Sequence, residues 1–235
     1  MQSPFANIPP VVKNLLIINI ICFLPYILFS SAQYNDIVVQ HFALFYVGSP
    51  FFKPWQILTY MFLHGGWEHI FFNMFALFTF GPILEYTVGS KRFFNLYFIS
   101  GIGAALFQLL VMAIEMYHFT GLFIVPSTFS SPDAAMIHKI ADIYYAPILG
   151  ASGAIFGILI GFGMLYPNME LMILFIPVPV KAKYIIPVYV LIELFLGFGQ
   201  IAGDNVAHFA HLGGALIGYI VVKTWHINRD NNIYR

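Results

Sequence analysis

Charged residues are scarce in this sequence. Only 9% of its 235 residues are Asp, Glu, Lys or Arg, whereas 60% are hydrophobic and 18% are aromatic. A water-soluble domain carries about 25% charged residues, so the composition excludes an ordinary soluble globule. The length suits about six membrane spans of roughly 20 residues each. We therefore expect a single domain over residues 1–235, an all-α bundle of six transmembrane helices.

Net charge, paired cysteines and a removable leader are also missing. Ten basic and ten acidic residues cancel, so the composition does not favour nucleic acid as a partner. The single cysteine, Cys22, excludes an internal disulfide and a cysteine-based metal or redox motif. The N-terminus lacks the charged region and small-residue cleavage site of a signal peptide. The first apolar run is therefore expected to be a retained span.

Six apolar stretches have the length that a span requires. They are predicted at residues 11–31, 67–86, 93–116, 148–166, 184–200 and 206–225. Two other apolar segments, Pro54–Leu63 and Leu171–Val180, are too short to cross and are predicted to be interfacial or re-entrant. The connection over residues 117–147 contains glycine and proline, and we expect it to form a short helix or disordered chain over the outer surface.

Basic residues are distributed unevenly between the two sides of a six-span bundle. Eight fall on one side, namely Lys13, Lys91, Arg92, Lys181, Lys183, Lys223, Arg229 and Arg235. Only Lys53 and Lys139 fall on the other. Because cytoplasmic loops carry an excess of Lys and Arg, both termini are predicted to be cytoplasmic. We expect a multi-pass protein of a bacterial plasma membrane.

Polar residues at membrane depth are costly and are therefore candidates for function. The predicted spans hold few of them, namely Glu68, His69, Asn73, Glu85, Ser152, Glu193, His208 and His211. Ser152 lies in the sequence Gly150-Ala151-Ser152-Gly153 at the start of the fourth span. A helix N-terminus offers unpaired N–H groups where negative charge could develop. Such a position suits a serine nucleophile, although a serine among glycines is also common in helix packing.

Small residues recur along the fourth and sixth spans. They are Gly153, Gly157 and Gly161 in the fourth, and Gly214 and Gly218 in the sixth. A spacing of four residues places them on one helix face, and two such faces can pack at close range. Ser152 and His211 lie at similar depths in these spans. If the two spans touch, the serine meets the histidine, which is the arrangement of an activated nucleophile and its general base.

His69 and Asn73 lie four residues apart, on one face of the second span near its outer end. Both side chains can donate a hydrogen bond. Together with the backbone N–H of Ser152 they could form an oxyanion hole.

These motifs together resemble the rhomboid family of intramembrane serine proteases. The matching elements are Gly150-Ala151-Ser152-Gly153 for Gly-x-Ser-Gly, Ala210-His211 through Gly214 and Gly218 for Ala-His-x-x-Gly-x-x-x-Gly, and His69 with Asn73 for His-x-x-x-Asn. Chain order and span numbers agree with the family, over about Trp55 to Gly218. The resemblance implies the six-span core form of the family.

The resemblance also implies a function. The chain would cleave transmembrane segments of other proteins near their outer ends, with those substrates and the lipid bilayer as its partners, and without a cofactor or metal. Ser152 would attack the scissile carbonyl and His211 would take the serine proton. His69 and Asn73 would stabilise the oxyanion, and Phe156 would pack against the imidazole. The family uses a Ser–His dyad, and no acidic residue pairs obviously with His211 in the sequence.

Several alternatives stay open. A rhomboid-like protein could bind transmembrane helices without cutting them, and a small-solute transporter would need a polar path that the sequence lacks. His208 and His211, with or without His69, could bind a metal, but no cysteine or carboxylate lies at ligand spacing. Glu193 is predicted to be a buried carboxylic acid or a contact to the second span. Gln56 stands where many members carry arginine, which puts the anchoring of the first loop in doubt. The sequence does not indicate an oligomeric state.

Overall fold

The computed structural model describes residues 8–126, 129–130, 133–173, 176–199 and 207–225. Within them, one helix overlaps each predicted span: α1 (Pro10–Leu28), α5 (Trp67–Val88), α6 (Ser90–Thr120), α8 (Ser152–Leu165), α9 (Ala182–Gly199) and α10 (His208–Thr224). Helices α1, α5, α6 and α9 are long and apolar enough to cross a membrane, whereas α8 and α10 are shorter. The predicted polytopic helical membrane bundle is confirmed.

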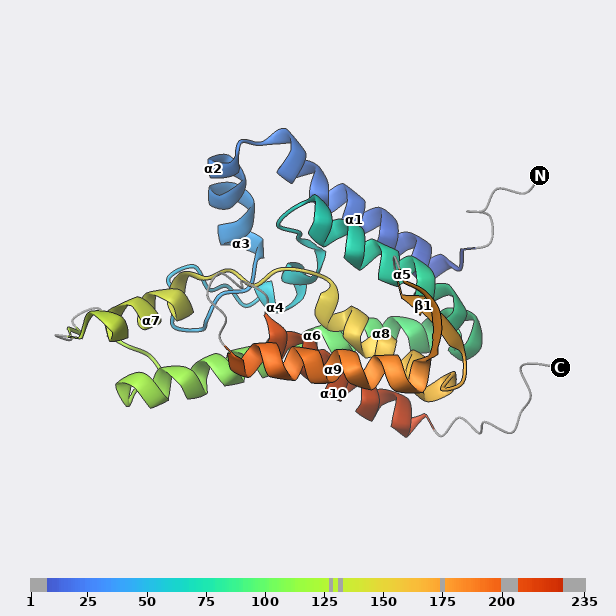
Figure 1. Cartoon of the computed structure of the whole chain (residues 1–235). Helices are drawn as coiled ribbons and strands as arrows, with labels where there is room; N and C mark the ends of the chain where they lie inside the picture. Colours follow the sequence, from blue (N-terminus) through green and yellow to red (C-terminus); the bar gives the residue numbers. More distant parts are fainter. Residues whose placement is uncertain (1–7, 127–128, 131–132, 174–175, 200–206, 226–235) are drawn as a thin grey trace.

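The shorter helices lie at the centre of the bundle. Helices α6, α8 and α10 make the most extensive contacts with one another, and α9 packs along α10 and α8. On another side, α1 packs against α5, and α5 contacts α8 (Figure 1). Apolar residues on the outer faces of the longer helices stay exposed, which is what a lipid-facing surface requires.

Glycine allows α10 to approach α8 backbone to backbone. A Cβ atom added to Gly214 would lie 1.9 Å from the carbonyl oxygen of Gly153, and one added to Gly218 would lie 2.5 Å from the Cα atom of Gly157. Both distances are shorter than van der Waals contact, so no larger residue fits without a shift of backbone. Such close packing of small residues is a main source of helix association in membranes.

A buried carboxylate ties α1 to the end of α5. Glu85 is 2% exposed, and its two carboxylate oxygens accept hydrogen bonds from the backbone N–H groups of Val11 (3.1 Å) and Val12 (2.8 Å). The hydroxyl of Ser90 donates a third bond at 2.6 Å. Because the first N–H groups of a helix have no partner within the helix, Glu85 satisfies the N-terminus of α1.

The segment between α1 and α5 is folded into short helices at one end of the bundle. They are α2 (Ser31–Gln33), the π-helical η2 (Tyr34–Val39), α3 (Gln40–Phe42), α4 (Gln56–Thr59) and the 3-10 helix η3 (Tyr60–Phe62). Gln56 is fully buried and holds this segment together. Its amide donates to the carbonyls of Gln40 (3.1 Å) and Phe51 (2.9 Å) and accepts the N–H of Lys53 (3.0 Å). Gln56 therefore supplies an anchor for the first loop without an arginine.

Helix α7 (Ala134–Tyr145) forms the helical part of the connection between α6 and α8. Asp133 caps its N-terminus by accepting the N–H groups of Ala135 (2.9 Å) and Met136 (3.4 Å). A short helix in this connection was one of the two predicted outcomes. Ser127 and Pro132, which lie in the same connection, fall outside the described residues.

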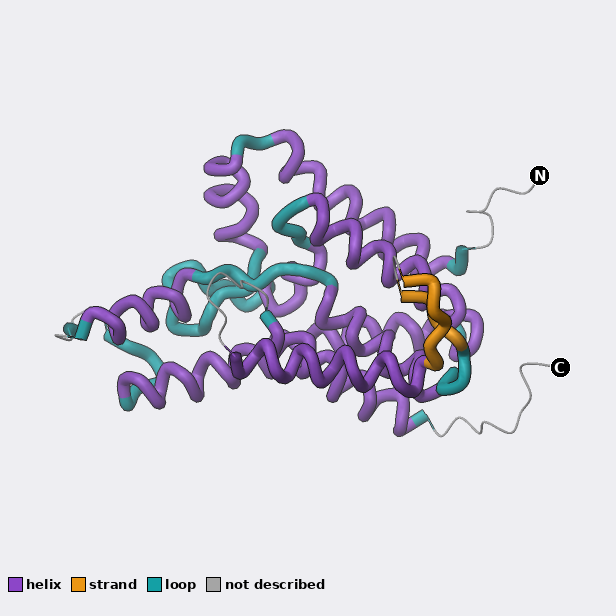
Figure 2. Tube along the Cα trace, viewed as in Figure 1, coloured by secondary structure: helices purple, strands orange, loops and turns teal. Residues whose placement is uncertain are grey.

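The fold is not entirely helical. The residues predicted to be interfacial or re-entrant form an antiparallel hairpin of β1 (Glu170–Ile173) and β2 (Ile176–Lys181), which joins α8 to α9 (Figure 2). Pro179 cannot donate a helical hydrogen bond, and Val178 and Val180 favour an extended backbone. The alternation of proline and valine thus explains why this segment is extended.

The hairpin lies at the same end of the bundle as the start of α1 and the end of α10 (Figure 1). The basic residues of the larger predicted group that are described lie at or beside helix ends on this side, namely Lys13, Lys91, Arg92, Lys181, Lys183 and Lys223. Lys53 and Lys139 belong to the opposite end, before α4 and within α7. Arg229 and Arg235 lie outside the described residues. The cytoplasmic location of the hairpin end stays a prediction.

Replacing Gly218 by alanine should destabilise the bundle, because the new methyl group would push the α10 backbone away from α8. Overpacking of this kind costs about 1–3 kcal/mol. We expect a lower thermal midpoint for the purified protein in detergent. Gly163→Ala, on α8, is the matched control, since the atom nearest to its added methyl group would be Cδ1, the flexible tip of Ile186, and not backbone. Equal midpoints for the two variants would contradict the close contact between α8 and α10.

Candidate active site

Ser152 is the first residue of α8, and the turn before it is held by backbone hydrogen bonds. The N–H of Gly150 donates to the carbonyl of Tyr60 at 2.9 Å, and Ile148 pairs with Leu44 through two bonds of 2.8 Å. Gly150 has φ +132°, a conformation that residues with a side chain rarely adopt. The first intrahelical bond runs from Ile155 to Ala151, so the N–H of Ser152 precedes the helical ladder.

His211 faces Ser152 from α10. Its Nε2 atom lies 2.7 Å from Ser152 Oγ, a hydrogen-bond distance. The imidazole stacks on the ring of Phe156, with ring centroids 4.6 Å apart and an angle of 10° between the planes. Phe156 lies one turn after Ser152 on α8, so this helix supplies both the hydroxyl and the surface on which the imidazole rests.

His69 approaches the same turn from α5. A Cβ atom added to Gly150 would lie 2.7 Å from His69 Nε2 and 3.5 Å from Ser152 Oγ, so the imidazole and the hydroxyl border one small space. The N–H of Gly65 donates to His69 Nδ1 at 3.4 Å. Because Nδ1 then acts as an acceptor, the neutral ring carries its proton on Nε2, the atom that faces Gly150. The absence of a side chain at Gly150 makes this approach possible.

Asn73 lies one turn after His69, and it is 6% exposed. Its side-chain Nδ2 donates to the carbonyl of His69 at 3.0 Å. An amide nitrogen has two N–H groups, so this bond occupies one of them. The bond also ties the asparagine to the turn of α5 that carries His69.

His64 is a buried neighbour of this group. It is fully buried in the loop before α5, and its ring packs edge-on against His69 with centroids 5.1 Å apart. Burial, and secondarily the neighbouring His69, lower the pKa of the His64 imidazole to about 3. The ring is therefore neutral at neutral pH and adds no charge to the site.

Glu193 lies beside His211, which corrects the expectation that no acidic residue pairs with this histidine. Its Oε2 atom lies 2.8 Å from His211 Nδ1 and 2.7 Å from His208 Nδ1. Of the two alternatives that the sequence left open for Glu193, the structure supports a buried, hydrogen-bonded side chain and not a contact to the second span. The structure instead pairs Glu193 on α9 with both histidines of α10. A lone glutamate in mid-span, followed by two histidines three residues apart, was the available signal.

The site residues predicted from the sequence fall into three groups, according to how they contact Ser152 and His211. Ser152, His211 and Phe156 are in direct contact, and His69 borders the same space as Ser152. Asn73 adjoins through the carbonyl of His69. The glycines lie at close contacts: Gly150 meets the His69 side chain, and Gly214 and Gly218 meet the α8 backbone. Gly153 offers its backbone to Gly214 and makes room for Ala104 of α6.

The sequence offered His208 and His211 as metal ligands but showed no carboxylate near them. The structure places the carboxylate of Glu193 beside both histidines. Among the described residues, Glu193, His208 and His211 have ligand atoms within 4.8 Å of one another. However, one oxygen lies 2.7 and 2.8 Å from two ring nitrogens, which are ordinary N–H···O distances. These distances fit hydrogen bonds from the two imidazoles to the carboxylate, and the absence of a metal stays a prediction.

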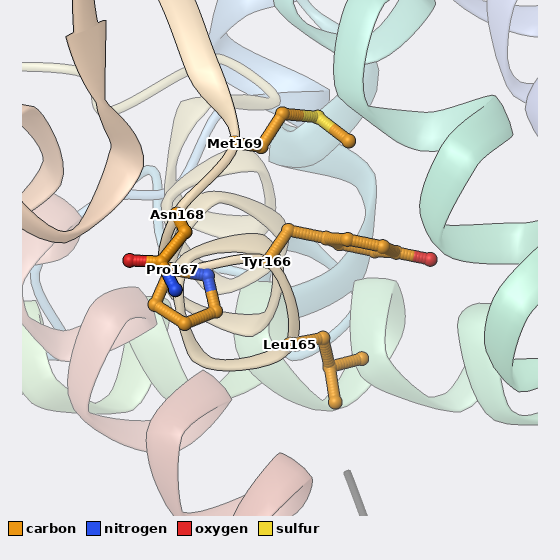
Figure 3. A pocket seen from close by; sticks show the side chains of 5 residues that line it. All are labelled: Leu165, Tyr166, Pro167, Asn168 and Met169. Atoms are coloured by element: carbon orange, nitrogen blue, oxygen red, sulfur yellow. The ribbon is translucent and has the colours of Figure 1, made fainter. Parts of the chain in front are cut away.

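A shallow hollow elsewhere is unrelated to these residues. It is lined by Leu165, Tyr166, Pro167, Asn168 and Met169, where α8 ends (Figure 3). Helix α8 has 14 residues, so this hollow lies roughly 20 Å along the helix from Ser152. The Tyr166 hydroxyl hydrogen-bonds to that of Thr87, which makes this a contact between α8 and α5.

Comparison with known proteins places the chain in a family. Residues 52–227 match the family model of the Rhomboid domain. Rhomboid protein 1, mitochondrial, of Saccharomyces cerevisiae is 28% identical over 174 residues, which cover 74% of this chain and 42% of that protein. Rhomboid protease AarA of Providencia stuartii is 32% identical over 179 residues, which cover 71% of this chain and 54% of that protein.

A third relative, Rhomboid protease GluP of Bacillus subtilis, is 30% identical over 167 residues, which cover 70% of this chain and 25% of that protein. The chain thus spans about half or less of the length of these relatives. The domain match covers most of the chain, including Ser152, His211, His69, Asn73 and Glu193. The chain is therefore an integral membrane protein that belongs to the rhomboid family.

Proposed function

We propose that this chain is an intramembrane serine endopeptidase that cleaves transmembrane segments of other membrane proteins near the outer face of the bilayer. The observation that carries the proposal is the 2.7 Å contact between Ser152 Oγ and His211 Nε2. It is within the reach that a nucleophile and its general base require. Family relatives named as proteases support the same function.

The geometry suggests how the reaction would proceed. His211 Nε2 takes the proton of Ser152 as the hydroxyl oxygen bonds to the scissile carbonyl carbon. The tetrahedral intermediate collapses when the C–N bond breaks and His211 gives the proton to the leaving amine. Water then hydrolyses the acyl-serine by the same proton transfers in reverse. The Phe156 stack keeps the imidazole plane in place throughout.

The negative charge on the carbonyl oxygen needs hydrogen-bond donors. The N–H of Ser152, at the N-terminus of α8, is one candidate, and the helix dipole favours negative charge there. His69 Nε2, which faces Gly150, is a second. The remaining N–H of Asn73 is a third. We assign these three groups to an oxyanion hole.

The substrate class follows from where the site lies. Ser152 is only partly buried, at the end of α8 opposite the hairpin. On α9, neighbouring exposed residues such as Leu191 (61%), Phe195 (73%) and Phe198 (72%) form an apolar surface suited to lipid or to a transmembrane helix.

With both termini in the cytoplasm, as the basic residues predict, the site would face the outer side. The relatives come from mitochondria and bacteria, so the bacterial plasma membrane stays a prediction.

Changing Ser152 to alanine should abolish proteolysis, because Ser152 carries the hydroxyl that hydrogen-bonds to His211 Nε2 among the described residues. In detergent, wild-type protein should cleave a model transmembrane substrate and react with a fluorophosphonate probe. Ser152→Ala should do neither, and His211→Ala should lose most of both, by about 10³-fold or more. Cleavage and labelling are measured in gels and by mass spectrometry.

Ser30→Ala is the matched control, since Ser30 is an exposed serine between α1 and α2 and should leave labelling unchanged. Cleavage that persists in both Ser152→Ala and His211→Ala would rule out the assignment. Wild-type protein that binds a transmembrane helix but neither cuts it nor reacts with the probe would instead indicate a non-proteolytic rhomboid-like binder.

Asn73→Ala should lower kcat only in part, because one donor of three is removed. A single oxyanion donor is worth up to about 10²–10³-fold in kcat, and the substrate KM should change little. Steady-state cleavage of the model substrate measures both. Asn95→Ala is the control, because Asn95 is an exposed asparagine on α6, and its kcat should equal that of the wild type. A wild-type kcat for Asn73→Ala would remove this residue from the site.

A further inference from the structure

We propose that Glu193 is a positioning residue for this reaction. The site then works as a hydrogen-bonded triad of Ser152, His211 and Glu193, and not as a dyad of Ser152 and His211 alone. The inference rests on the proposed protease function and deepens it. The three side chains form one continuous chain of hydrogen bonds, from Ser152 Oγ to His211 Nε2 at 2.7 Å and from His211 Nδ1 to Glu193 Oε2 at 2.8 Å.

The carboxylate selects the tautomer of His211. An ionised carboxylate has no proton and can only accept a hydrogen bond. The proton between the two groups must therefore be on His211 Nδ1, which leaves the lone pair of Nε2 directed at Ser152. A general base needs this tautomer, because the alternative would present an N–H to the serine hydroxyl.

His208 keeps the carboxylate in place. Its Nδ1 atom lies 2.7 Å from the same Oε2 oxygen that His211 contacts. Glu193 and His211 are each 9% exposed, and His208 is 8% exposed. A buried carboxylate is costly unless it is hydrogen-bonded. Two N–H donors on one oxygen offset that cost and fix the side chain in the orientation that His211 uses.

The sequence context of Glu193 sets it apart from its neighbours. Ile192 and Leu194 on either side are 47% and 41% exposed, whereas Glu193 is turned into the bundle toward α10. The surrounding face of α9 is apolar, so the glutamate is the one acidic residue that this part of the helix directs at the site. At this position Glu193 provides a hydrogen-bond acceptor for His211, whereas a lipid-facing surface would not require a carboxylate.

The carboxylate also acts during the reaction. When His211 takes the proton of Ser152, the imidazole becomes positively charged, with the carboxylate already 2.8 Å from Nδ1. Attraction between opposite charges is stronger in buried surroundings than in water. The Phe156 ring fixes the plane of the imidazole, and Glu193 fixes its rotation within that plane. The charge and the orientation together lower the barrier to proton transfer.

The test compares Glu193→Gln with wild type in detergent. Glutamine keeps the size of the side chain but has no charge, and it can present an N–H to His211. We expect kcat to fall by about 10²–10⁴-fold, with KM nearly unchanged, since only the proton transfer is affected. The rate of fluorophosphonate labelling at Ser152 should fall in parallel. Glu193→Asp retains the charge and should recover part of the rate.

Glu68→Gln is the matched control, because Glu68 is an exposed carboxylate on α5, and it should keep the wild-type kcat. A wild-type kcat and labelling rate for Glu193→Gln would overturn the inference while leaving the proposed function intact. A rise in KM with kcat unchanged would also overturn it. Wild-type protein that neither cleaves nor labels would instead defeat the proposed function itself.

Two measurements on the unaltered protein keep the inference testable if Glu193→Gln does not fold. Nitrogen-15 NMR of histidine-labelled protein, with the His211 signals identified by their loss in His211→Ala, should show the proton on Nδ1. A proton on Nε2 would overturn the inference. Activity should also persist in EDTA, since Glu193 is proposed to accept a hydrogen bond from His211 and not to bind a metal ion. Loss of activity in EDTA, restored by zinc, would assign the three side chains to a metal.

Discussion

The whole arrangement depends on a contact in which two helices touch through their backbones. A Cβ atom on Gly214 or Gly218 of α10 would collide with the backbone of Gly153 or Gly157 of α8. A Cβ atom on Gly153 or Gly157 would itself collide with Ala104 or Ser100 of α6. In a bilayer, burial of apolar surface does not favour one helix contact over another, because lipid is equally apolar. Dispersion and close fit must hold the helices together, so the absence of side chains along this line determines their separation.

The chemistry of the site follows from that separation. Ser152 begins α8 and His211 lies in the first turn of α10, so helices at backbone contact bring the hydroxyl and the imidazole to 2.7 Å. Elements farther out then surround the pair. Helix α5 brings His69 against the side-chain-free Gly150, and α9 brings Glu193 to Nδ1 on the edge of the His211 imidazole. A site of this kind tolerates little movement, because each partner is held by a different helix.

The sequence predicted what depends on local pattern. Apolar runs located the helices, and glycines four residues apart identified the faces of α8 and α10, so the contact of Ser152 with His211 could be anticipated. The pairing of Glu193 with His211 could not, since it depends on how α9 turns against α10, which no periodicity reveals. The extended conformation of the hairpin at 170–181 was not predicted, because a short apolar run does not distinguish a strand from a buried helical segment. The anchoring of the first loop was doubted because Gln56 replaces an arginine. The three hydrogen bonds by which Gln56 anchors this loop join residues that only the fold brings together.

An experimental structure of the uninhibited protein in lipid tests the central contact most directly. We expect Ser152 Oγ and His211 Nε2 to lie within hydrogen-bond reach, about 2.6–3.2 Å apart, with the backbones of Gly153 and Gly214 in van der Waals contact. A structure in which α8 and α10 are separated by another helix, or in which the hydroxyl and the imidazole face opposite sides of the bundle, would contradict the account.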